Sequence, residues 1–155
     1  MQDALLVILA AMTPLGELRA SVPLGILHFE LDWPLVYVLS VLGNVLPVPP
    51  LLWGLRTVGS RLERSGTVVG RGLRWRTARV EAQWGERVRR HGPWVVALIV
   101  AIPLPLTGAW TGALAVWALR VPVRKGLAAI GAGVLVAGVV VTALTLAGVG
   151  LVKLL

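Results

Sequence analysis

Residues 92–119 decide the fold, and they read GPWVVALIVAIPLPLTGAWTGALAVWAL. The stretch holds no charged residue over 28 positions, and a bilayer span needs about 20. Its centre contains Pro103, Pro105 and Gly108, and two prolines and a glycine within six residues break a helix. Each arm then has about 10 to 12 residues, or about 15 to 18 Å, which is half a bilayer. We predict a re-entrant hairpin here, with a single proline-kinked span as the alternative.

The charges on both sides of this stretch favour the hairpin. Residues 56–91 contain ten Arg and three Glu, a local balance of +7, and the link 120–125 adds three more cations. By the positive-inside rule both flanks belong in the cytoplasm, whereas the acidic segment around Glu30 and Asp32 belongs outside. A hairpin that enters and leaves the membrane on the cytoplasmic side keeps both basic flanks in the cytoplasm, as this rule requires.

The composition of the whole chain is that of a membrane protein. Of its 155 residues 57% are hydrophobic and 14% are charged, and the mean hydropathy is +0.83. That length leaves no room for an additional soluble catalytic domain. The absence of cysteine excludes disulfides, thiolate metal sites and cysteine nucleophiles. The first residues lack the basic start of a signal peptide, so we expect the opening apolar run to stay in the mature protein.

Another hairpin is predicted over residues 4–29, where Pro14 and Pro23 bracket two charges and an acidic loop follows. It is the first hairpin along the chain, and residues 92–119 form the second. Spans over 34–55, running inward, and 126–152, running outward, follow the two hairpins. Pro34 and Gly43 of the first half are matched by Pro122 and Gly131 of the second half, 88 residues later. Pro14 is likewise matched by Pro103, 89 residues later. We therefore expect a single all-α integral membrane domain with two inverted halves, 1–55 and 92–155, joined by the basic segment 56–91.

The basic segment is predicted to lie on the inner leaflet. Val80, Trp84 and Val88 recur at helical spacing within residues 77–90, whereas the glycines and serines of the first half predict irregular chain. The opposite face carries arginines that suit anionic lipid, and nucleic acid is the disfavoured alternative for so short and tethered a segment. These lipid-facing residues are Arg79, Arg87, Arg89 and Arg90.

Glu17 and Arg19 lie within the first hairpin. Inserting a charged side chain at that depth of the membrane costs at least ~2.5 to 3.5 kcal/mol of free energy. Arg19 can hold an anionic headgroup in two hydrogen bonds, and Glu17 can accept a proton or a cationic substrate. The alternative is a salt bridge that fixes the hairpin turn. We take the pair as the first candidates for handling substrate and protons.

Two further groups are candidates for lining the same site. Asn44 lies near the middle of the first span, where Pro47 predicts unwinding, although it could equally bridge two helices by a hydrogen bond. Thr107, Trp110 and Thr111 surround the glycines of the second hairpin, where a half-helix N-terminus suits an anion or a dipole. The small residues Ala129, Gly133 and Ala137 form a packing face on the last span.

The sequence offers no enzyme site. Neither histidine has partners at metal-ligand spacing, and no nucleophile, base and acid lie at a common depth. No phosphate-binding loop is present, so ATP hydrolysis is excluded. We expect no cofactor and no metal; coupling would use an ion such as H⁺ or Na⁺.

Three ordered motifs resemble the small multi-drug export family of prokaryotic membrane proteins. They are GELR (16–19) with PLG (23–25), GNVLPVP (43–49), and AIPLP (101–105) followed by TGAWTGA (107–113). That family is similar to the DedA-like membrane proteins, whose paired re-entrant hairpins are linked to movement of polyprenyl phosphate or phospholipid. The resemblance implies lipid-carrier translocation, with Arg19 in the position of a hairpin arginine that the DedA-like group uses.

These observations together predict a multi-pass transporter in the prokaryotic cytoplasmic membrane that moves a small amphiphilic substrate, driven by a gradient. The alternatives are a DedA-like flippase for polyprenyl phosphate or another anionic lipid, and a non-transporting scaffold that acts through its basic helix. The expected partners are membrane lipids, and the small-residue face of the last span suggests a homodimer.

Overall fold

The computed structural model describes residues 2–102 and 108–154, and every regular element within them is helical. In chain order these are α1 (Gln2–Met12), α2 (Glu17–Pro23), the π-helical turn η1 (Leu24–His28), α3 (Trp33–Val45), α4 (Val48–Gly54), the π-helical turn η2 (Leu55–Gly59), α5 (Ser60–Arg64), α6 (Val68–His91), α7 (Trp94–Ala101), α8 (Ala109–Ala118) and α9 (Val123–Leu154). The predicted all-helical class is confirmed.

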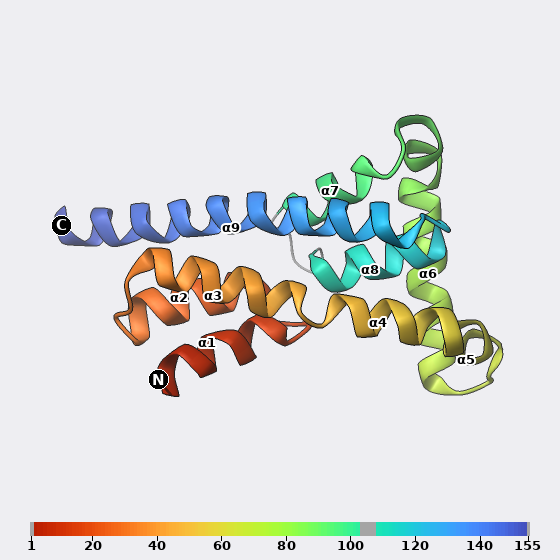
Figure 1. The fold of residues 1–155 in the computed structure, drawn as a ribbon, viewed down its shortest axis with the longest axis horizontal. Helices are drawn as coiled ribbons and strands as arrows, with labels where there is room; N and C mark the ends of the chain where they lie inside the picture. Colours follow the sequence, from red (N-terminus) through yellow and green to blue (C-terminus); the bar gives the residue numbers. More distant parts are fainter. Residues whose placement is uncertain (1, 103–107, 155) are drawn as a thin grey trace.

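Two long helical rods run side by side through the molecule in opposite directions (Figure 1). The first runs from Trp33 to Arg64 through α3, α4, η2 and α5, and the second is α9. Both are long and apolar enough to cross a membrane, over 32 and 29 residues respectively. The Tyr37 hydroxyl on α3 donates to the carbonyl of Leu135 on α9 at 3.2 Å and so links the rods.

Short helices pack in pairs beside the rods. α1 runs from one end of the bundle to its middle, the chain turns at residues 13–16, and α2 returns to the same end (Figure 1). α7 and α8 pack against each other at the other end, close to α6. Each pair also packs against a rod, α1 and α2 on α3, and α7 and α8 on α9.

The basic helix α6 crosses the end of the bundle, almost perpendicular to α9 (Figure 1). It begins at Val68, earlier than the predicted residue 77, because the Thr67 hydroxyl caps the first turn by accepting the Gly70 N–H at 3.2 Å. It ends where Gly92 adopts a φ of +75°, a conformation that glycine adopts at little cost.

The prediction of irregular chain in the first half of residues 56–91 is wrong, since only residues 65–67 interrupt the helices there. Gly59 and Gly70 lie within helical turns and allow close packing there, whereas Gly66 lies in the break. A Cβ on Gly59 would lie 2.7 Å from the indole of Trp117, and a Cβ on Gly70 would lie 2.6 Å from the carbonyl oxygen of Ser65.

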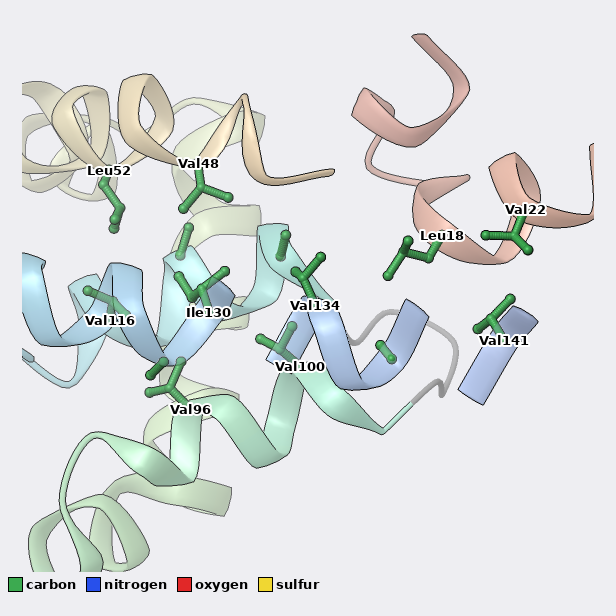
Figure 2. Packing of buried hydrophobic residues seen from close by; sticks show 14 of the residues in the cluster. Leu18, Val22, Val48, Leu52, Val96, Val100, Val116, Ile130, Val134 and Val141 are labelled. Atoms are coloured by element: carbon green, nitrogen blue, oxygen red, sulfur yellow. The ribbon is translucent and has the colours of Figure 1, made fainter. Parts of the chain in front are cut away.

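The apolar core surrounds α9 (Figure 2). Ile130 and Val134 of α9 are fully buried, and Val96 and Val100 of α7 lie beside them. The same cluster includes buried residues of α1, α2, α3, α4 and α8. Further along α9, Val141 lies opposite the side chains of α2 (Figure 2). The core therefore joins the two hairpin-like pairs through one shared helix.

Glycines on the two rods make closely similar contacts with the short helices. A Cβ on Gly43 would lie 2.6 Å from the Ile8 carbonyl oxygen of α1, and one on Gly133 would lie 2.6 Å from the Ala97 carbonyl oxygen of α7. A Cβ on Gly131, which the sequence matched to Gly43, would have no atom within 4 Å. Gly133, two residues further along α9, therefore makes the contact that resembles that of Gly43.

The small-residue face of α9 is a packing surface, as predicted, and it is used within the chain. Ala129 and Ala137 are 1% and 5% exposed, and Gly133 lies against α7. Because the chain's own helices cover this face, it does not supply the surface for the expected homodimer.

Gly133→Val is expected to lower the free energy of unfolding by about 2 to 3 kcal/mol, because the side chain would overlap the α7 backbone. Gly131→Val is the matched control on the same helix and should change it by less than about 0.5 kcal/mol. Chemical unfolding in detergent, followed by circular dichroism, measures both. Equal effects of the two variants would contradict the packing described here.

Candidate substrate site

The turn between α1 and α2 places Glu17 in an uncommon backbone conformation. Pro14 lies within this turn, and the Thr13 hydroxyl stabilises it by donating to the Ala10 carbonyl at 2.8 Å and accepting the Gly16 N–H at 3.1 Å. Glu17 follows with a φ of +47°. Such a conformation costs a non-glycine residue about 1 to 3 kcal/mol and is frequent at functional sites.

The carboxylate of Glu17 lies against the start of α8. Glu17 is 7% exposed, and its carboxylate occupies the space that a Cβ on Gly108 would fill. It accepts a hydrogen bond from the backbone N–H of Trp110 in the first turn of α8. A helix N-terminus favours a negative charge, so the second half of the chain stabilises the carboxylate of the first.

A small cavity of about 10 Å³ adjoins this contact, room for about one water molecule. Its described lining comes from α2, α3, α7, the start of α8, and α9, and consists of Glu17, Leu18, Arg19, Asn44, Val100, Gly108, Ala137 and Val141. The structure therefore brings Asn44 to the same cavity as Glu17 and Arg19, the pair that the sequence predicted to handle substrate and protons.

Asn44 and Arg19 complete the polar lining of the cavity. Asn44 is 1% exposed, and its Oδ1 accepts no hydrogen bond from any described residue. The Arg19 guanidinium is close enough to act on the Glu17 carboxylate electrostatically. A buried, unpartnered amide oxygen costs about 1 to 3 kcal/mol, which is an argument against Asn44 serving only as packing.

The family model described as "Putative small multi-drug export protein" matches residues 17–140. The chain belongs to the small multi-drug export family. The match begins at Glu17 and includes every described residue of the cavity lining except Val141. No match to the chain is found among the curated proteins or among the solved structures.

Of the three residues predicted to line the site from residues 92–119 of this family member, Trp110 and Thr111 are among the described residues. The Trp110 indole donates to the Met12 carbonyl at 3.3 Å, which joins α8 to the end of α1, and only its backbone N–H reaches Glu17. Thr111 does not line the cavity. Thr107, Pro103 and Pro105 lie outside the described residues.

The prolines of the first half behave differently from one another. Pro47 lies in the two-residue break between α3 and α4, so the predicted unwinding is confined to that point. The predicted break at Pro23 is wrong, because the helix continues through it into η1. Proline lacks the N–H of a regular helix, and a change to π-helical bonding lets the chain continue.

Three buried oxygen atoms near the cavity escaped the sequence analysis. The hydroxyls of Ser21 on α2, Ser40 on α3 and Thr142 on α9 are buried, and none bonds to a described residue. Ser21 follows Glu17 by four residues and Ser40 precedes Asn44 by four, so helical spacing could have identified both. The described residues contain no group of three or more metal-ligating side chains.

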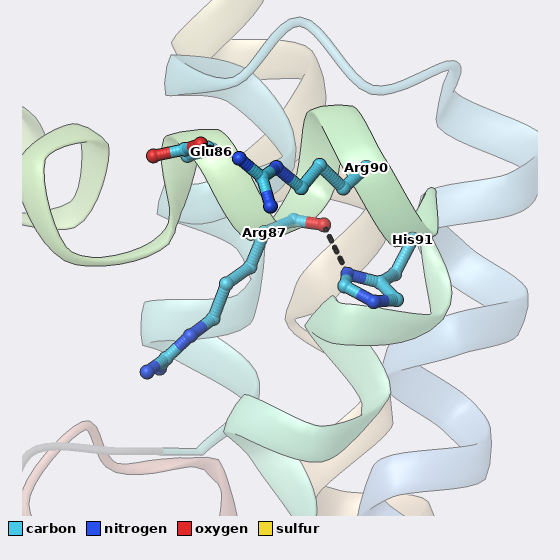
Figure 3. Close-up of polar contacts among 4 residues, drawn as sticks. All are labelled: Glu86, Arg87, Arg90 and His91. Atoms are coloured by element: carbon cyan, nitrogen blue, oxygen red, sulfur yellow. Dashed lines mark hydrogen bonds and ion pairs between the residues drawn. The ribbon is translucent and has the colours of Figure 1, made fainter.

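The predicted lipid-facing arginines of the family member are all exposed on α6. Arg79 lies 5.5 Å from the ring centroid of Trp75, and Arg87 lies 5.0 Å from that of Trp84. Arg90 pairs with Glu86 at 2.6 Å on the surface, which adds little to stability. Figure 3 shows this pair and the contact of His91 Nδ1 with the Arg87 carbonyl at 3.3 Å. The side chain of Arg89 lines a separate cavity, described below.

Proposed function

We propose that this protein transports a small amphiphilic substrate across the cytoplasmic membrane, with the central cavity as the place where substrate or coupling ion is handled. The carrying observation is the buried Glu17 carboxylate, held at the start of α8 beside Arg19 and beside Asn44, whose Oδ1 has no hydrogen-bond partner among the described residues. Charges at this depth are costly and mark transport sites in membrane proteins. Their convergence from both halves of the chain supports transport.

The proposal includes an inverted repeat of the two halves, and the positions at which their helices begin support it. α7 begins at residue 94, 92 residues after α1 at residue 2; α8 begins at 109, 92 residues after α2 at 17. α9 begins at 123, 90 residues after α3 at 33. The two rods run in opposite directions (Figure 1), as an inverted repeat requires.

The glycine contacts follow the same offset. Gly43 and Gly133 are 90 residues apart and lie against equivalent positions of α1 and α7. A Cβ on Gly25 would lie 2.6 Å from Val36, and one on Gly126 would lie 2.6 Å from Val116. Val116 lies 91 residues after Gly25, and Gly126 lies 90 residues after Val36. The same helix contact therefore recurs in the second half, but there the glycine and the valine have exchanged places.

The proposed placement in the membrane follows from charge and length. The end of the bundle that carries α6 and the basic link faces the cytoplasm, with α6 on the inner leaflet. The pairs α1–α2 and α7–α8 are then re-entrant hairpins that enter from opposite sides. The start of α2 and the start of α8 then meet where Glu17 contacts Gly108, near the middle of the bilayer.

The cavity is too small for an organic substrate, so the proposed mechanism includes separation of the hairpins. Opening would withdraw Glu17 from the Trp110 N–H and from Gly108. Neutralising the carboxylate with H⁺ or Na⁺ weakens its attraction to the N-terminus of α8. Ion binding would thereby favour the open state and couple an ion gradient to substrate movement.

A DedA-like flippase for an anionic lipid is the second candidate function, and Arg19 favours it. When Glu17 moves away, the first N–H groups of α8 and the Arg19 guanidinium would both be available to a phosphate. The two candidates share the site and differ in the substrate.

Flux into proteoliposomes tests the proposal, with a fluorescent polyprenyl phosphate and a cationic dye as rival substrates under an imposed pH gradient. Glu17→Gln and Arg19→Ala are each expected to lower the initial rate of the transported substrate at least tenfold. The reason is that each removes a charge from the cavity. Arg124→Ala is the matched control, because this exposed cation lies outside the cavity lining and should leave the rate unchanged.

The outcomes separate the candidates. Dye movement that depends on the gradient supports export, whereas lipid movement that depends on Arg19 supports the flippase. If folded protein moves neither substrate, transport is contradicted. A scaffold function would then predict loss of lipid association on Arg→Glu substitution at Arg79, Arg87 and Arg90.

A further inference from the structure

A second polar cavity lies at the other end of the molecule from the N-terminus, where α6 crosses the bundle. Its volume is about 480 Å³, far larger than the central cavity. The α6 residues Thr77 and Glu81 line it, together with residues of η2, α5 and α8 and the link after α8. An adjoining cavity of about 430 Å³ shares Glu81, Ala118 and Arg120 and adds Arg89.

The larger cavity is lined by two positive and two negative side chains. Arg56 and Arg120 supply the cations, and Glu63 and Glu81 supply the carboxylates. Within residues 2–102 and 108–154, these four form no ion pair with one another. Arg56 makes a long hydrogen bond of 3.4 Å to the Val121 carbonyl, and Glu63 accepts the Thr77 hydroxyl at 2.8 Å.

Opposite charges that share a cavity without pairing have space between them for a ligand that carries both signs. An anion alone would be repelled by Glu63 and Glu81, and a cation alone by Arg56 and Arg120. A zwitterion satisfies both pairs. Arginine suits phosphate geometry, and a carboxylate suits an ammonium group.

The indole of Trp117 adds an aromatic surface to this cavity. Gly59 allows the ring to pack closely, because a Cβ there would lie 2.7 Å from Cζ2 of Trp117. Tryptophan is enriched at the level of lipid headgroups, and its ring also attracts an ammonium ion. Both properties suit a headgroup that contains an amine.

The backbone at Arg120 is another notable feature of this cavity. Arg120 follows α8 with a φ of +54°, and the Val121 N–H bonds to the Val116 carbonyl at 2.9 Å, the hydrogen bond of a helix end that usually carries glycine at this position. An arginine held in a glycine conformation at the wall of a charged cavity points to a role for its side chain.

We propose that this cavity binds the headgroup of a zwitterionic phospholipid, with the phosphate at Arg56 and Arg120 and the ammonium at Glu63 and Glu81. The site lies where α6 crosses the end of the helical bundle, the level of the inner-leaflet headgroups in the proposed orientation. Binding here depends on that orientation and is independent of whether the protein transports a substrate.

The test measures lipid retention by native mass spectrometry of the purified full chain, titrated with phosphatidylethanolamine or phosphatidylglycerol of matched acyl chains. Wild type is expected to retain phosphatidylethanolamine at least fivefold more strongly than phosphatidylglycerol. Glu81→Gln should reduce this preference at least threefold, since it removes a partner of the ammonium and a repulsion of the anionic lipid. Glu86→Gln is the matched control, because Glu86 lies on the same helix and does not line the cavity.

The Arg120→Gly variant tests whether lipid binding is lost in a protein that still folds. Glycine suits the φ of +54°, so the variant should fold with unchanged or higher thermal stability and lose at least fivefold in retention of phosphatidylethanolamine. Equal retention of the two lipids by wild type would overturn the proposal, as would an unchanged preference in folded Glu81→Gln. Competition by glycerophosphoethanolamine at the affinity of the lipid itself would show that the ligand is a soluble phosphoamine and overturn the lipid assignment.

Discussion

Gly108→Ala is expected to lower the free energy of unfolding by about 3 to 5 kcal/mol and to abolish transport. The new methyl group would occupy the position of the Glu17 carboxylate, and the φ of +146° is unfavourable for any residue with a Cβ. The carboxylate would have to leave the N-terminus of α8. Thermal unfolding in detergent and flux in proteoliposomes measure the two effects.

A double-mutant cycle shows whether the contact with Glu17 is the cause. In the background of Glu17→Ala the overlap is removed, so Gly108→Ala should cost about 2 kcal/mol less there than in wild type. Gly54→Ala is the control, because no atom lies within 4 Å of the position its Cβ would take. Additive effects at Glu17 and Gly108 would contradict the contact.

Asn44→Leu is expected to reduce transport at least tenfold while the protein stays as stable as wild type or becomes more stable. The Asn44 Oδ1 has no described hydrogen-bond partner, so an apolar side chain of similar size removes a cost of about 1 to 3 kcal/mol. If Asn44 were instead a hydrogen-bonded link between helices, the variant would lose about 0.6 to 2 kcal/mol.

Ser40→Ala is the matched control for Asn44. Ser40 lies one turn away on α3 and is likewise buried without a described partner, and it does not line the central cavity. Its loss should leave transport unchanged. A drop in transport as large as that of Asn44→Leu would show that the whole face of α3 matters, and the specific role of the Asn44 amide would be wrong.

The elements that the sequence predicted well are those governed by the cost of polar groups in a bilayer. Uncharged length predicted the two long apolar helices, and the cost of charge in a bilayer selected Glu17 and Arg19, which the structure places with Asn44 around one cavity. Such costs are several kcal/mol per group, so local preferences do not override them.

The features that the sequence did not predict are those set by packing. Glycine costs a helix only about 1 kcal/mol, so Gly59 and Gly70 remain helical where close contacts with Trp117 and Ser65 require them. The contact of Gly108 with Glu17 joins residues that are 91 positions apart in the sequence, and no pattern of neighbouring residues predicts it. The sequence match of Gly43 to Gly131 has the same limit, since only contacts with α7 distinguish Gly133 from Gly131.

Glu17 also limits how the two halves could have evolved. Under the proposed inverted repeat α8 begins 92 residues after α2, so Gly108 is the counterpart of Gly16 and Ala109 is the counterpart of Glu17. In an ancestral antiparallel homodimer with glutamate at this position, each copy would have placed a carboxylate at the centre, and the two would repel. The present chain has glutamate in one half and alanine in the other, which only a fused gene or two diverged genes can encode. Gene fusion would thus have made a single acidic group at the centre of the fold accessible to selection.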